Sequence, residues 1–106
     1  MDENKIQEMQ MLEQNLQNLL MQKQAFQMEL SETVSALKEV ESAGEEVYKI
    51  AGQLMIKSDK TKMLGELSEK EKMLKLRSET IEKQESTIVE KLEKLRGEIM
   101  KQEEKK

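Results

Sequence analysis

The spacing of apolar residues in the first part of the chain limits the possible folds more than any other feature. From Met9 onward, positions separated by alternating intervals of three and four residues are apolar in eight cases out of ten. These positions are Met9, Leu12, Leu16, Leu19, Lys23, Phe26, Leu30, Thr33, Leu37 and Val40. An alternation of this length places one narrow apolar seam along a helix, as in a coiled coil. It predicts a helix over residues 1–43 that stops at Gly44, a residue suited to the left-handed conformation just past a helix end.

A second seam of the same kind runs through the last part of the chain. Its apolar residues are Leu64, Leu67, Leu74, Ile81, Ile88, Leu92, Leu95 and Ile99. Glu71, Ser78 and Glu85 stand where the second apolar row should continue, so either a single row contacts the partner helix there or the register shifts. Asp59 or Thr61 can cap the start of this helix.

The segment between the two seams has a pattern typical of strands. Val47-Tyr48-Lys49-Ile50-Ala51 and Leu54-Met55-Ile56-Lys57 are rich in β-branched and apolar residues, and Gly52-Gln53 separates them. A two-residue spacer of this type predicts a tight β-hairpin. The register that it sets pairs Ala51 with Leu54, Lys49 with Ile56 and Val47 with Ser58. A plain connector between helices is the alternative, although a connector has no need for so many β-branched residues.

Both faces of this hairpin are substantially apolar, and a lone hairpin is marginal in water. We therefore expect strands from other chains to complete the sheet. The predicted oligomerisation residues are Val47, Tyr48, Ile50, Ala51, Leu54, Met55 and Ile56.

The two helical parts have similar lengths of roughly 40 residues, or about 60 Å each at 1.5 Å per residue. They can therefore bury both seams within one chain as an antiparallel pair, with both termini at the same tip. The predicted fold is an α-helical antiparallel coiled-coil hairpin with one central β-hairpin. It forms a single domain over 1–106, with helices in 1–43 and 62–106 and the assembly segment in 44–61. A parallel coiled-coil homodimer that acts as a tether or spacer is the alternative.

Composition excludes several classes of function. The chain has no Cys and no His, which removes thiol and imidazole catalysis and the usual zinc ligands. Carboxylate chemistry remains open, but no enzyme activity, cofactor or metal is expected. The net charge of -4 is unfavourable for binding nucleic acid. No apolar run is long enough for a membrane span, and Met1-Asp2-Glu3-Asn4 is unlike a secretory signal, so we expect a cytoplasmic protein.

With these features in place, the chain resembles the β-type subunits of archaeal prefoldin along essentially its whole length. The most specific likeness is the block Val47-Tyr48-Lys49-Ile50-Ala51-Gly52 before a short apolar strand. A first helix rich in Gln and Leu precedes it. A charged helix containing Leu74-Lys75-Leu76-Arg77 and Glu82-Lys83-Gln84-Glu85 follows it. One hairpin rather than two favours the β type. Gln53 departs from the Asn that is common in the family, which leaves the turn geometry open.

The resemblance implies a hexamer of two α-type and four β-type subunits, in which the hairpins form a double β-barrel and the paired helices project from it. It also implies an ATP-independent holdase that captures unfolded proteins between the helix tips and transfers them to a group II chaperonin. The partners implied are an α-type subunit, unfolded clients and the chaperonin.

Apolar residues near the shared tip are the candidate client contacts. They are Ile6, Met9, Met11, Leu12, Leu16, Leu95, Ile99 and Met100. Met11 lies off the seam, as do Leu20, Met21 and Met28, so these side chains should be exposed. Methionine is flexible and polarisable, which suits a surface that contacts many different clients.

Overall fold

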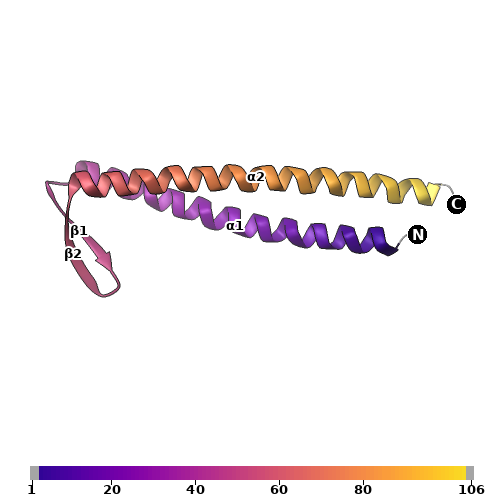
Figure 1. Cartoon of the computed structure of the whole chain (residues 1–106), viewed down its shortest axis with the longest axis horizontal. Helices are drawn as coiled ribbons and strands as arrows, with labels where there is room; N and C mark the ends of the chain where they lie inside the picture. Colours follow the sequence, from indigo (N-terminus) through magenta and orange to yellow (C-terminus); the bar gives the residue numbers. More distant parts are fainter. Residues whose placement is uncertain (1–2, 105–106) are drawn as a thin grey trace. The chain divides into compact units, whose positions relative to one another are not determined.

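The computed structural model describes residues 3–104, with side chains through residue 102. Helix α1 (Glu3–Ser42) is followed by strands β1 (Glu46–Ala51) and β2 (Leu54–Asp59) and by helix α2 (Lys60–Glu104), as Figure 1 shows. Two long helices thus flank one antiparallel hairpin, which confirms the predicted fold.

Contacts group the chain into two compact units. Phe26–Arg77 forms one unit, and the described residues up to Ala25 form the other together with those from Ser78 onward. The prediction that 1–106 is a single domain stays a prediction.

The predicted seams are the faces that the two helices bury. Each of the ten seam positions of α1 is half-buried or buried, whereas most positions between them are exposed. In α2 the most deeply buried side chains are Leu74, Ile81, Leu92 and Leu95. Glu71, Ser78 and Glu85 are half-buried as well, so the alternation of three and four residues continues through the polar stretch without a register shift.

Ion pairs define the antiparallel register in the unit that contains the start of α1. Lys5 Nζ lies 3.5 Å from Glu98 Oε2, and Lys23 Nζ lies 3.3 Å from Glu85 Oε2. An early residue of the chain therefore lies beside a late one, and the parallel homodimer is wrong. Pairs this near the surface contribute about 0–1 kcal/mol each, so they select the register while the apolar seam supplies most of the stability.

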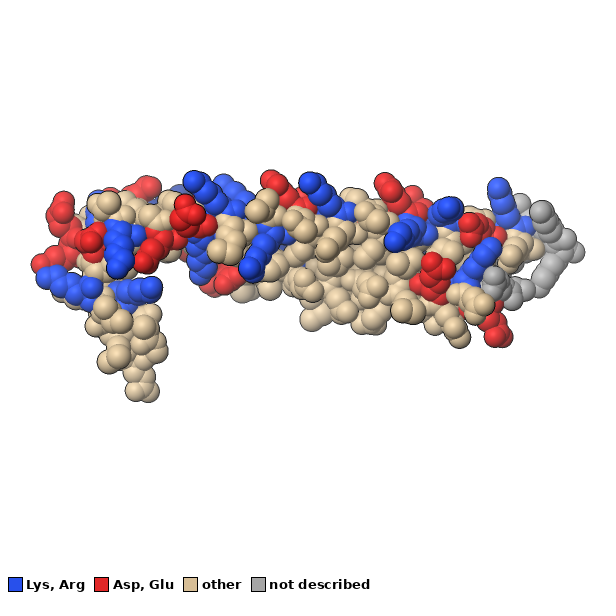
Figure 2. Space-filling model, viewed as in Figure 1, with Lys and Arg blue, Asp and Glu red and all other residues tan. Residues whose placement is uncertain are grey.

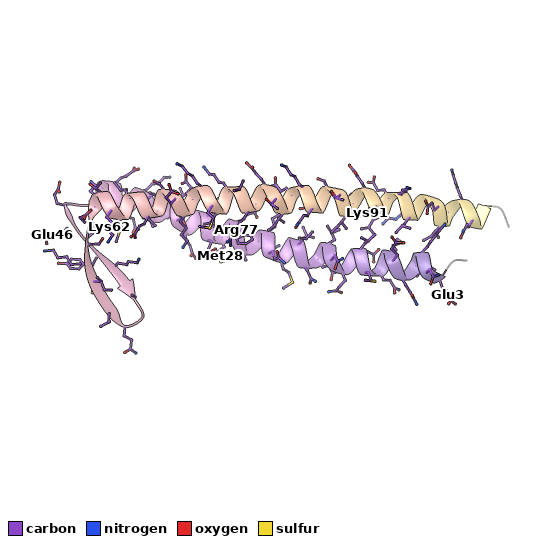
Figure 3. The ribbon with its side chains drawn as sticks, in the orientation of Figure 1. Glu3, Met28, Glu46, Lys62, Arg77 and Lys91 are labelled. Carbon is purple, nitrogen blue, oxygen red and sulfur yellow. The ribbon has the colours of Figure 1, made fainter. Side chains whose placement is uncertain are left out.

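The unit Phe26–Arg77 has antiparallel helix contacts of its own. The guanidinium carbon of Arg77, labelled in Figure 3, lies 5.9 Å from the centre of the Phe26 ring, within the range of a cation–π contact. Lys70 Nζ also lies 3.9 Å from Glu29 Oε1. Buried Thr33 donates its hydroxyl proton to the Glu29 carbonyl at 2.8 Å, so a polar seam residue is satisfied within its own helix.

Helix α1 ends at Ser42, and the expectation that Gly44 adopts the left-handed conformation is wrong, because its φ is not positive. A lysine side chain, not a glycine, caps the C-terminal end of this helix. Lys60 Nζ donates hydrogen bonds to the carbonyls of Glu41 at 2.8 Å and Ala43 at 3.1 Å. An ammonium group can satisfy the free carbonyls at a helix end and is favoured by the helix dipole there.

Helix α2 begins at Lys60, two residues before the predicted start at residue 62. Of the two candidate caps, Asp59 is the one used. Its Oδ1 accepts a hydrogen bond from the Lys62 backbone N–H at 2.6 Å. A carboxylate in this position satisfies one of the free N–H groups of the first turn.

The hairpin has the register that the sequence predicts, from Ala51 opposite Leu54 to Val47 opposite Ser58. Gly52 has a φ of 63°, whereas the φ of Gln53 is not positive. A positive φ at the first turn residue alone is the pattern of a type II′ turn, which places no glycine or asparagine requirement on the second residue. This pattern explains why glutamine is accommodated at position 53.

Gly52→Ala is expected to destabilise the hairpin, whereas Gly44→Ala is not. A Cβ at either position would meet nothing within 4 Å, so the two variants differ mainly in backbone conformation. A left-handed residue other than glycine costs about 1–2 kcal/mol, equivalent to roughly 5- to 30-fold faster amide exchange in the strands. Hydrogen–deuterium exchange measures this difference, and equal exchange in both variants would contradict the assigned turn.

Candidate functional site

The hairpin presents apolar side chains to solvent on both faces. Tyr48 is 52% exposed, Ile50 73%, Leu54 68%, Met55 71% and Ile56 49%. Figure 2 shows that the far end of the hairpin carries no charged residue, whereas Lys, Arg, Asp and Glu gather where it meets the helices. A two-stranded ribbon also leaves two unpaired edges. The hairpin is therefore an exposed apolar surface of the kind that marks protein–protein contact.

Val47 differs from the other predicted oligomerisation residues because it is only 7% exposed. It pairs with half-buried Ser58, one residue before the end of β2, at the base of the hairpin. The side chain of Val47 is thus buried by residues of this chain and is not available for contact with another chain. Ala51 and the five large apolar residues remain exposed, and their role in assembly stays a prediction.

A groove of about 450 Å³ lies where the hairpin meets the helices. Its lining residues are Ala36, Glu39 and Val40 of α1, Tyr48 and Lys49 of β1, and Met63, Glu66, Leu67 and Lys70 of α2. Lys49 Nζ lies 3.7 Å from Glu66 Oε2, which links β1 to α2. This ion pair joins the hairpin to α2, and residues of α1 complete the groove lining.

The eight candidate client contacts fall into three groups. Met11 is 68% exposed and Met100 is 57% exposed, so both side chains are available to a client. Leu95 is buried in the helix pair. The half-buried residues are Ile6, Met9, Leu12, Leu16 and Ile99. The other helix covers the seam positions. This explains why Met11, which lies off the seam, is more exposed than the seam residues. The role of all eight residues in client binding stays a prediction.

The other off-seam residues that the sequence singled out are exposed too: Leu20, Met21 and Met28. Between Gln14 and Met28 the only charged residue is Lys23. Figure 2 shows the resulting uncharged surface over α1, in contrast to the charged surface of α2.

A second groove of about 540 Å³, which was not predicted from the sequence, opens between α1 and α2 in the unit that contains both described chain ends. Its lining residues are Asn15, Asn18, Leu19, Gln22, Lys83, Gln84, Thr87 and Ile88. The absence of charge along this part of α1 was the signal that could have located it.

Two further observations concern metal binding and membrane spans. Within residues 3–104, no cluster of three or more acidic side chains is arranged to hold a metal ion. In the same part of the chain, neither helix has an apolar stretch sufficient to cross a bilayer.

Comparison with known protein families gives one match that spans nearly all of the chain. The model of the family described as "Prefoldin subunit" matches residues 3–106. Among curated proteins, prefoldin subunit β of Thermococcus onnurineus is 43% identical over 89 residues, which cover 82% of this chain and 77% of the relative. Prefoldin subunit β of Saccharolobus islandicus, strain L.S.2.15, is 40% identical over 92 residues, covering 85% and 73%.

A solved structure agrees with these sequence matches. The crystal structure of the prefoldin β subunit from Thermococcus strain KS-1 superposes with a TM-score of 0.85 at 37% sequence identity. The superposition covers 92% of this chain and 88% of the other. At this level of identity and coverage, sequence and fold point to the same family.

Proposed function

This chain belongs to the prefoldin family of chaperone subunits, and we propose that it is a β-type subunit of an ATP-independent holdase that captures unfolded proteins and passes them to a group II chaperonin. No reaction is part of this proposal, because holding a client requires only reversible contacts. A cytoplasmic location and the absence of a bound cofactor belong to the same proposal.

The observation that carries the proposal is the exposed apolar hairpin. Five large apolar side chains of twelve strand residues face solvent, which leaves the ribbon unstable unless other strands cover it. The proposed covering is the hairpins of α-type and further β-type subunits, in a hexamer of two α and four β chains. Such an assembly buries the hairpins and leaves the helices free for clients.

Client capture is proposed at the exposed methionines Met11 and Met100 and at the seam residues around them. Burying about 100 Å² of client apolar surface per contact contributes roughly 2.5 kcal/mol before ordering costs. Contacts of this strength are individually reversible and become effective when several subunits act together. Gly97 lowers the stability of α2 by about 1 kcal/mol relative to alanine, which favours opening of the seam near Leu95.

An aggregation assay tests the holdase proposal. A chemically unfolded client is diluted with and without the assembled protein, in the absence of nucleotide, and light scattering is recorded. The assembled protein is expected to suppress the rise in scattering when it equals or exceeds the client in concentration. Equal scattering in both samples would contradict the proposed function.

A further inference from the structure

The groove between α1 and α2 has an apolar floor and polar walls in which Lys83 is the single charged residue. Leu19 and Ile88 are seam residues that remain half-buried at its base. The exposed polar residues that flank them are Asn15, Asn18 and Gln22 on α1, and Lys83, Gln84 and Thr87 on α2. One charged group among eight lining residues is unusual in a chain in which 38% of residues are charged. The groove therefore suits a mostly uncharged ligand, with Lys83 as its single charged lining residue.

The carboxamides of this groove are not used by the fold. Asn15, Asn18, Gln22 and Gln84 have no hydrogen-bond partner in the described part of the chain. Each carboxamide offers two N–H donors and one acceptor oxygen. Thr87 donates to the Lys83 carbonyl at 3.0 Å, and its oxygen can still accept. The walls thus carry both donors and acceptors on either side of an apolar strip.

We propose that this groove binds the main chain of an extended, unfolded polypeptide segment. The inference rests on the proposed holdase function and specifies what the holdase recognises. Backbone N–H and C=O groups of an extended segment have no partner within their own chain and match the donors and acceptors of the walls, while an apolar side chain reaches Leu19 and Ile88. A helical segment already pairs its backbone groups internally and gains nothing from the carboxamides.

Binding of the main chain distinguishes unfolded from folded proteins without selecting for a particular amino-acid sequence. A surface made only of methionine recognises apolar side chains, whereas free carboxamides recognise unpaired backbone, which every unfolded protein exposes. The absence of acidic residues among the groove lining also avoids selection against acidic clients.

The test compares two fluorescent probes on the assembled full-length protein. One is an uncharged twelve-residue peptide of alternating leucine and serine, and the other is its depsipeptide analogue, with esters in place of alternate amides. Esters lack the N–H donor, and one net hydrogen bond corresponds to roughly threefold to tenfold in affinity. The wild-type assembly is expected to bind the ester analogue at least about fivefold more weakly.

The triple variant Asn18→Leu, Gln22→Leu, Gln84→Leu is expected to bind the amide and ester probes with equal affinity. Its leucines make the groove more apolar, but they should not restore the preference for the amide probe. The matched control is the double variant Gln17→Leu, Gln24→Leu, in exposed α1 positions outside the groove lining. It should keep the wild-type preference for the amide probe.

Three results would overturn the proposal. The first is equal binding of both probes by the wild type, and the second is tighter binding of a stapled helical peptide of the same composition. The third is a change in assembly mass in the triple variant, which would make the groove an interface between copies. Suppression of client aggregation by the wild type tests the holdase function separately. If suppression persists while the probes bind equally, only the groove inference fails.

Discussion

Ile50→Glu is expected to abolish assembly of this chain with an α-type subunit. Ile50 is 73% exposed in the isolated chain, so a charge there costs the monomer little. In the proposed hexamer the same side chain is buried. Loss of its apolar burial removes roughly 2–3 kcal/mol, equivalent to on the order of 100-fold at each affected contact, and an unpaired buried carboxylate adds to this. Native mass spectrometry of the mixed subunits should show the six-chain complex for the wild type and free chains for the variant.

Glu69→Lys is the matched control for a change of charge. Glu69 is exposed on α2 outside the hairpin and should leave assembly intact. Circular dichroism of both variants should show the helical content of the wild type, because neither residue lies on a seam. A six-chain complex that forms normally with glutamate at position 50 would place the assembly contacts elsewhere.

The triple variant Met11→Gln, Met21→Gln, Met100→Gln is expected to lose client capture while it retains assembly. These methionines are exposed side chains of one compact unit. Glutamine has similar length and helix propensity, so the replacement removes apolar contact without disturbing the helices. If each methionine contributes about 1 kcal/mol or more to a client contact, the affinity for an unfolded client should fall on the order of 100-fold. Light scattering of an unfolded client, without nucleotide, measures the loss.

Met73→Gln provides the control for this prediction. Met73 is half exposed, belongs to the other compact unit and is not one of the candidate client contacts. It should suppress aggregation as well as the wild type does. Equal loss in the control would mean that exposed methionines anywhere on the helices bind clients, and unchanged capture in the triple variant would exclude these methionines as client contacts.

Much of the fold could be predicted because its signals are local. A seam position is recognisable from neighbours three and four residues away, and each predicted position of α1 is buried or half-buried. The hairpin register followed from the two-residue turn, because Gly52-Gln53 fixes which residues oppose each other. For the candidate site, the same periodicity placed Met11 and Met21 outside the seam, and both are exposed.

The remaining features depend on residues that are distant in the sequence. The sequence shows Lys23 and Glu85 as two defects in separate seams, and only the antiparallel packing makes them partners. In the same way, Lys60 can cap the carbonyls of Glu41 and Ala43 only because the chain folds back between the two helices.

The sequence by itself determined the two helical seams, the hairpin and its register, since each follows from propensity and periodicity over a few residues. Only the tertiary structure decided that Val47 is covered, that Gly44 is not the helix cap, and that unpaired carboxamides from both helices line one groove. The physical reason is that burial and hydrogen-bond partnership are properties of pairs of surfaces, which exist only after the chain has folded back on itself.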